Sequence, residues 1–204
     1  MRKFSLLAAI PAGLLFLYSY SYFGSALNLG QGFSFRLRGE FAKGFLGLLF
    51  SPARGLFVFS PIFILSLPYI PKIFSKNEEK ITKYLLVCLA LTVLAYSKWG
   101  MWWGGHSFGY RIIMECIPIL MIFLVKSWME IISKNKFLII LFFVLTAVSL
   151  YFNFLGARIY PCAFNYSPND IDRHTERLWQ VKGTELLRCS NNFISPIIYK
   201  LFPK

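Results

Sequence analysis

The sequence predicts an all-α protein: a polytopic transmembrane helical bundle of about five spans, with a short extracytoplasmic C-terminal tail. The chain has 204 residues, of which 56% are hydrophobic and only 15% charged. That apolar balance is too high for an ordinary soluble domain. The apolar residues also gather in stretches that approach the roughly 20 residues needed to cross a bilayer as a helix. We therefore expect a transmembrane domain over residues 1–157 and a polar tail over residues 158–204.

The charge of the chain is strongly positive, with 22 lysines and arginines against 9 aspartates and glutamates, a net charge of +13. In a chain this apolar, the positive charge is better explained by cytoplasmic loops and by contacts with phosphate-bearing lipid than by nucleic acid. We expect membrane lipid as a partner and no nucleic acid.

The first predicted span covers residues 4–23. Arg2 and Lys3 precede it and several tyrosines lie near its end, as in a helix that enters from the cytoplasm. A cleaved signal peptide is the alternative, because the small residues 24–26 follow the apolar run. We favour the membrane helix, because the run is long for the apolar core of a signal peptide.

The second predicted span, residues 56–70, is the weakest. It is short and contains Pro61 and Pro68, so part of it could be a broken helix that is buried against other segments. Residues 45–50, just before it, are too few to span and are expected at the membrane interface.

Three further spans are predicted at residues 84–103, 112–125 and 137–154. With the N-terminus inside, nine lysines and arginines fall on the cytoplasmic side and five fall in the outer loops, which supports a cytoplasmic N-terminus and an outer tail. The nine are Arg2, Lys3, Lys72, Lys76, Lys80, Lys83, Lys126, Lys134 and Lys136, and the five are Arg36, Arg38, Lys43, Arg54 and Arg111.

The four cysteines divide into two kinds. Cys88 and Cys116 fall inside predicted spans, where a thiol serves as a small apolar side chain. Cys162 and Cys189 share the outer tail, where an oxidising compartment would allow them to form a disulfide. The two histidines are far apart and no C-x-x-C occurs, so we expect no metal site and no cofactor.

The strongest candidate site is the turn at residues 96–111. It packs three tryptophans and four glycines beside Lys98, His106 and Arg111. A lipid-facing helix end needs an aromatic residue but not these glycines and cations, whereas aromatic faces beside fixed positive charge suit a sugar and a phosphate. The alternative is an aromatic belt with a snorkelling lysine and a structural pair between Arg111 and Glu115.

Arg54, in a turn at the same interface, is a further cation. The expected substrate-binding residues are Arg54, Lys98, Trp102, Trp103, His106 and Arg111.

The catalytic residues are unknown from the sequence, because a general base is usually a carboxylate or histidine and few stand on the outer side. The candidates are Glu40, Asp170, Asp172, Glu176, Glu185, His106 and His174. Glu40 lies among basic residues and is expected to pair with Arg36 or Arg38. In the tail, residues 167–179 are typical of a short helix capped by Asn169 or Asp170.

Several motifs together resemble a known group of membrane enzymes. They are Y-F-G-S at 22–25, G-L-L-F-S-P-A-R-G-L-F-V-F-S-P at 47–61, W-G-G-H-S-F-G-Y-R at 103–111 and D-R-H-T-E-R-L-W at 172–179. In this order they resemble the C-terminal half of bacterial glycosyltransferases of the GT-C superfamily, of the protein-mannosyltransferase-like and aminoarabinose-transferase-like kinds.

The resemblance implies a multi-pass protein of the bacterial inner membrane that uses a polyprenyl-phosphate sugar on the outer face. In that superfamily the catalytic acidic residue lies in the first outer loop, and here that loop offers only Glu40. The resemblance therefore implies that this chain is the C-terminal portion of a split or truncated gene, or that it needs a partner chain that carries the N-terminal half. A non-catalytic membrane subunit or pseudoenzyme is the alternative function, and a small carrier of lipid or polyprenol is a third.

Overall fold

The computed structural model describes residues 2–24, 39–75 and 78–201, and these residues form helices and turns without any strand. The chain divides into two compact units, Met1–Leu37 and Arg38–Lys204, each of which is described by itself. The all-α prediction is confirmed for the described residues.

Within its described residues, 2–24, the first unit holds a single helix, α1, over Arg2–Phe23. It covers the predicted span at residues 4–23, and Pro11 lies within it without ending it. Leu14, Leu17 and Tyr20 are exposed. That the helix crosses a membrane, or is instead a cleaved signal, stays a prediction.

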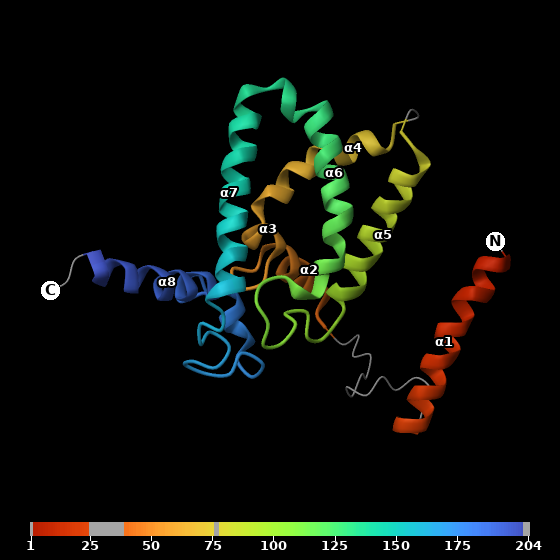
Figure 1. Cartoon of the computed structure of the whole chain (residues 1–204), viewed down its shortest axis with the longest axis horizontal. Helices are drawn as coiled ribbons and strands as arrows, with labels where there is room; N and C mark the ends of the chain where they lie inside the picture. The colour runs from red at the N-terminus through yellow and green to blue at the C-terminus, as the bar shows by residue number, and fades with distance from the viewer. Residues whose placement is uncertain (1, 25–38, 76–77, 202–204) are drawn as a thin grey trace. The chain divides into compact units, whose positions relative to one another are not determined.

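The second unit contains three helical segments that are long and apolar enough to cross a membrane (Figure 1). They are α5 (Lys80–Ser97), the segment Arg111–Lys134 and α7 (Lys136–Arg158). The middle segment joins a 3₁₀ helix, η2 (Arg111–Cys116), to α6 (Ile117–Glu130) and the short 3₁₀ helix η3 (Ile132–Lys134). At 1.5 Å per residue their 18, 24 and 23 residues approach or exceed the ~30 Å hydrocarbon layer. Large apolar side chains on them, such as Leu91, Phe143 and Leu150, are exposed, as lipid-facing side chains would be.

The predicted spans at residues 112–125 and 137–154 lie within two of these segments, but the predicted end of the span at residues 84–103 is wrong. Helix α5 ends at Ser97, six residues early, and the chain then turns. Gly100, Gly104 and Gly105 follow, and glycine is a poor helix former. The last two adopt left-handed backbone angles, with φ of 76° and 65°, that an α-helix excludes.

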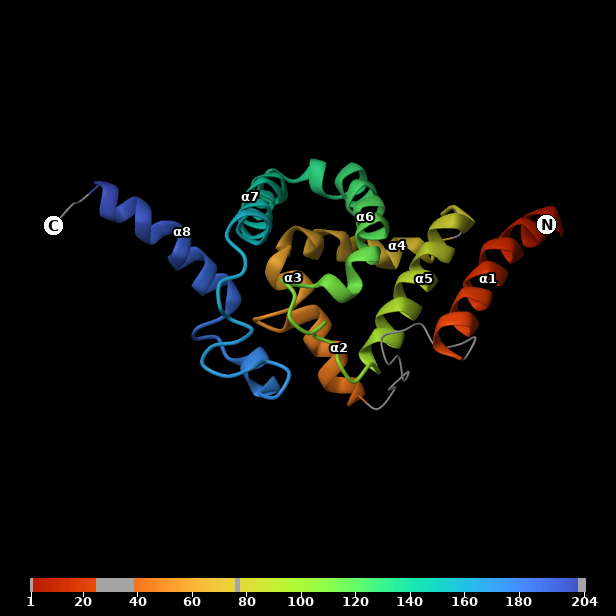
Figure 2. The ribbon, with the colours of Figure 1, turned by 60° about the horizontal axis from the view of Figure 1, so that its bottom comes forward.

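The segment predicted as the second span is a broken helix, as one interpretation of the sequence allowed. It consists of α3 (Leu56–Phe59), a 3₁₀ helix η1 (Pro61–Tyr69) and α4 (Ile70–Ile73). Element η1 lies between α6 and α7 in both views (Figures 1 and 2). The Ser149 hydroxyl accepts from the Ile62 N–H at 3.2 Å and the Ser127 hydroxyl donates to the Leu65 carbonyl at 2.6 Å. Neighbouring helices thus satisfy backbone groups that the prolines free.

Helix α2 (Phe41–Phe50) includes the stretch predicted at the interface and packs closely against the end of α5 and the turn that follows. A Cβ atom at Gly44 would lie 2.1 Å from the Ser97 carbonyl oxygen, and one at Gly47 would lie 2.4 Å from the Trp102 ring. Only glycine permits this approach.

The predicted tail folds against the bundle. It contains a 3₁₀ helix, η4 (Thr175–Trp179), and α8 (Glu185–Leu201), which packs on α7. Of the helix predicted over residues 167–179, only the last five residues, Thr175–Trp179, are helical. Asn169 and Asp170, the predicted N-caps, are wrong, because His174 precedes η4. Asp170 instead accepts the Asp172 N–H at 2.8 Å, a local bond that competes with helix formation. The boundary predicted between residues 157 and 158 stays a prediction, as does the count of about five spans.

Candidate functional site

The candidate site lies at one end of the bundle, where α5 ends, η2 begins and α7 ends (Figure 1). Two segments meet there, residues 98–110 and residues 159–184, and together they are called the platform below. The disulfide between Cys162 and Cys189 joins the platform to α8, and this is the pairing that the sequence allowed. The other two cysteines are free, with Cys88 exposed and Cys116 buried.

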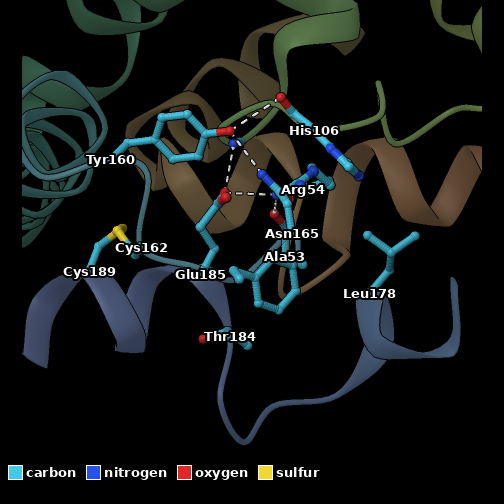
Figure 3. A network of polar contacts seen from close by, with 12 residues as sticks. Ala53, Arg54, His106, Tyr160, Cys162, Asn165, Leu178, Thr184, Glu185 and Cys189 are labelled. Atoms are coloured by element: carbon cyan, nitrogen blue, oxygen red, sulfur yellow. Dashed lines mark hydrogen bonds and ion pairs between the residues drawn. A yellow bond between two sulfur atoms is a disulfide. The ribbon is translucent and has the colours of Figure 1, made fainter. Parts of the chain in front are cut away.

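Arg54 lies inside the platform and not at its surface (Figure 3). Its Nη1 is 2.7 Å from Oε2 of Glu185, in an ion pair whose side chains are 1% and 0% exposed. Its Nη2 donates to Oδ1 of Asn165 at 2.6 Å. The turn between α2 and α3 and the first residue of α8 are thus joined through two fully buried charges. Arg54 is therefore a buried, paired cation, and its predicted role in binding a lipid phosphate stays a prediction.

The polar network around Arg54 continues to the edge of the platform. Asn165 donates to the Tyr160 hydroxyl at 2.8 Å, and that hydroxyl donates to the His106 carbonyl at 3.2 Å (Figure 3). The Gly109 N–H donates to Glu185 at 3.2 Å. Burial raises the pKa of Glu185 to about 7, although Arg54 and the Gly109 N–H favour the carboxylate. Burial also lowers the pKa of Arg54.

A second arginine, Arg177, holds the 164–169 loop together. It is buried, and its guanidinium donates to the carbonyls of Phe164 at 2.8 Å and Ser167 at 2.6 Å, and to that of Asn169. It also lies over the Phe164 ring, 4.8 Å from the centroid. An arginine offers five donors in a planar fork, so it can saturate several carbonyls of a loop that forms no helix or strand of its own.

The two tryptophans predicted to bind a ligand are buried, with Trp102 7% and Trp103 8% exposed. Trp102 packs on Trp103 and Trp179, with ring centroids 6.0 and 5.9 Å apart. Trp103 donates from Nε1 to Oδ1 of Asp172 at 2.7 Å. Both indoles therefore support the platform from within, which leaves little ring face for a sugar.

The other predicted residues remain accessible. Lys98 and Arg111 are exposed, and neither forms an ion pair with any residue that the structure describes. The predicted pair between Arg111 and Glu115 is absent from the described ion pairs, because η2 is a 3₁₀ helix, in which residues four apart do not share a face.

His106 lies at the platform edge, half-buried, and faces two carboxylates from the tail. Its Nε2 is 3.3 Å from Oδ2 of Asp170 and 3.6 Å from Oδ2 of Asp172. The Tyr166 ring packs edge-on against the imidazole at 4.5 Å between centroids. The pKa of Asp170 is lowered, first because the Asp172 N–H donates to it, so the carboxylate is charged at neutral pH.

The remaining acidic candidates lie elsewhere. Glu40 is exposed and pairs with Lys43 at 2.8 Å, whereas its predicted partners Arg36 and Arg38 lie outside the described residues. Glu176 is exposed and contacts His174 at 3.1 Å. Glu185, Asp170 and Asp172 are candidate acids in the sequence, but the sequence does not indicate which basic residues they contact. Glu185 lies 131 residues from Arg54, and Asp170 lies 64 residues from His106.

No known protein family, curated protein or solved structure matches this chain. The resemblance to GT-C glycosyltransferases therefore stays a prediction, and the functional argument rests on the residues themselves.

Proposed function

We propose that this chain is a multi-pass membrane protein that binds the phosphate-bearing headgroup of a lipid at the platform, with a polyprenyl-phosphate sugar as the ligand class. The observation that carries the proposal is the exposure of Lys98 and Arg111 at the ends of apolar helices, without ionic partners among the described residues. Cations at this depth are suited to a lipid phosphate. His106 lies on the same platform and provides a further polar contact.

The proposed ligand site differs from the one expected from the sequence. Arg54, Trp102 and Trp103 hold the platform together, and Lys98, His106 and Arg111 remain to meet a ligand. The rigid interior supports this division, because a ligand gains affinity when the groups that bind it are held in place beforehand.

The test is binding of a polyprenyl-phosphate sugar to the detergent-purified chain, measured by native mass spectrometry against the uncharged polyprenol. We expect Arg111→Ala, alone and with Lys98→Gln, to weaken binding by about tenfold or more per cation, which corresponds to ~1.4 kcal/mol. The matched control is Lys134→Gln with Lys136→Gln, two exposed lysines at the opposite end of the bundle. Unchanged binding in the Arg111 variant, or an equal loss in the control, would overturn the proposal.

A non-catalytic membrane subunit is the second candidate, and two observations favour it. Glu185 is neutralised by Arg54 in the interior, and Glu40 is exposed and paired with Lys43. Neither carboxylate is placed to act as a base toward a sugar acceptor. If the chain binds the lipid but transfers no sugar to added acceptors, with or without a partner that carries the N-terminal half, the subunit function is the correct one.

A further inference from the structure

Three side chains at the platform edge have the types and spacing of metal ligands. One nitrogen of His106 and one carboxylate oxygen each of Asp170 and Asp172 all lie within 4.8 Å of one another. The imidazole comes from the turn after α5 and the carboxylates come from the tail, so only the folded platform brings them together.

The two separations between the imidazole nitrogen and the carboxylate oxygens fit a single small ion, and the three ligand atoms lie within 4.8 Å of one another. Nitrogen and oxygen ligands stand about 2.0–2.2 Å from Zn²⁺, so two of them at tetrahedral angles lie roughly 3.3–3.6 Å apart. The His106 Nε2 is 3.3 Å from Asp170 Oδ2 and 3.6 Å from Asp172 Oδ2. One imidazole with two carboxylates favours a divalent transition metal over Mg²⁺ or Ca²⁺, which prefer oxygen ligands alone.

Groups outside the cluster orient its ligands. The Trp103 indole donates to Asp172 Oδ1 at 2.7 Å, which leaves Oδ2 toward His106. The Tyr166 ring fixes one side of the imidazole. Hydrogen bonds of this kind to ligating carboxylates are typical of metal sites.

One further buried polar group lies next to His106 in the chain. Ser107, the residue after His106, is 4% exposed, and its hydroxyl has no hydrogen-bond partner among the described residues. A buried hydroxyl without a partner calls for a water molecule or a ligand. A Cβ atom at the adjacent Gly105 would make ordinary van der Waals contact, at 3.9 Å from the Met101 methyl carbon and 4.0 Å from Asp172 Oδ2.

We propose that His106, Asp170 and Asp172 bind one divalent transition metal ion, Zn²⁺ or Mn²⁺, and leave coordination positions open to water or an anionic oxygen. This revises the expectation from the sequence that the chain has no metal site. The proposal does not depend on lipid binding, because the ion is held by the chain alone.

The experiment uses the full chain, purified in detergent through a tag without histidines and stripped with a chelator. Zn²⁺ is titrated by calorimetry and Mn²⁺ by electron paramagnetic resonance, in both cases without lipid. We expect one equivalent of metal and a loss of affinity of at least tenfold in His106→Gln, Asp170→Asn and Asp172→Asn. Trp103→Phe should weaken binding by about tenfold, because it removes only the outer hydrogen bond.

The matched controls are His174→Gln and Glu176→Gln, which disrupt a second histidine–carboxylate pair on the same segment, for which the described residues offer no third ligand. They should bind metal like the wild type. A wild type that binds no more tightly than the triple variant His106→Gln/Asp170→Asn/Asp172→Asn, or an equal loss in the controls, would overturn the site.

A variant that fails to fold is recognised by its thermal midpoint without metal. In that case the test is made on the wild-type chain, because a metal ion that binds the native state must raise the thermal midpoint of the wild type. A midpoint that added Zn²⁺ or Mn²⁺ leaves unchanged would overturn the proposal.

Discussion

The guanidinium of Arg54 contacts the carboxylate of Glu185 at 2.7 Å across 131 residues of chain, and both side chains are fully buried. The contact joins the turn after α2 to the start of α8. Two charges removed from water are tolerable only when they are paired and hydrogen-bonded, and Asn165 and the Gly109 N–H supply further bonds.

Removal of one partner of this pair should destabilise the chain strongly. Arg54→Met leaves the Glu185 carboxylate buried without a cation, and we expect a loss of about 3–5 kcal/mol. The measurement is unfolding of the purified chain by SDS titration. The double variant Arg54→Met/Glu185→Leu should recover much of the loss, because it buries no charge. If the double variant loses as much free energy of unfolding as the single variants Arg54→Met and Glu185→Leu added together, the two side chains do not act as a pair.

The pH dependence of stability follows from the pKa of Glu185, which is about 7 in the folded chain against an ordinary value of 4.5. Between these values the folded chain holds a proton that the unfolded chain releases. Stability from this group is therefore present at about pH 4.5 and declines as the pH rises to about 7.

Glu185→Gln cannot titrate, so its stability should not decline with pH in this window as that of the wild type does. The difference in stability between the wild type and Glu185→Gln should therefore shrink as the pH rises to about 7 and stay constant above it. Thermal midpoints of both proteins between about pH 5 and pH 8 give the difference. A deficit that is constant or grows with pH contradicts the raised pKa.

Local sequence pattern is sufficient to predict some elements of this fold. Residues 112–125 and 137–154 lie within helical segments that are long and apolar enough to cross a membrane, as predicted, because a long apolar run has few alternatives to a helix. Pro61 and Pro68 likewise marked the broken segment. The predicted end of α5 is too late, because tryptophans extend the apolar pattern past Ser97. The glycines among them adopt backbone angles that end the helix.

The site shows where local pattern fails. Arg54 has the same sequence signal whether it faces lipid or Glu185, because the choice depends on a carboxylate 131 residues away. His106, Asp170 and Asp172 have no ligand spacing along the chain and converge only when the tail folds onto the turn. Pairing over such distances depends on tertiary packing, which the spacing of single residues does not encode.

The disulfide should contribute substantially to the stability of the platform. Cys162 and Cys189 are separated by 27 residues, and closure of a loop of this length is worth about 3–4 kcal/mol in the chain-entropy account. We expect Cys189→Ser to lower the thermal midpoint and to make the protein insensitive to reductant. Cys88→Ser, which changes a free exposed cysteine, is the control and should behave like the wild type. A wild-type midpoint that reductant leaves unchanged would count against a stabilising role.

Gly44 should tolerate no side chain. Alanine in place of glycine within a helix ordinarily gains about 1 kcal/mol. Here its methyl group would lie 2.1 Å from the Ser97 carbonyl oxygen, a backbone atom that cannot rotate away. Overpacking typically costs 1–3 kcal/mol, so we expect Gly44→Ala to destabilise the chain.

The matched control is Gly13→Ala in α1, where an added Cβ atom meets nothing within 4 Å. Both variants are compared with the wild type by SDS titration. A Gly44 variant as stable as the Gly13 variant would show that α2 and α5 can separate at little cost.

The contacts that close the platform also set an order of biogenesis. Ser51 bonds to the carbonyl of Leu178, Arg54 to Glu185 and Trp103 to Asp172, so each contact joins an early part of the chain to a late one. Arg54 leaves the ribosome 131 residues before its carboxylate and must stay hydrated until that carboxylate arrives. The platform therefore closes only after all three apolar helices have been synthesised. A chain stopped before residue 185 would contain the three apolar helices but carry the Arg54 guanidinium without the carboxylate that pairs with it in the folded chain.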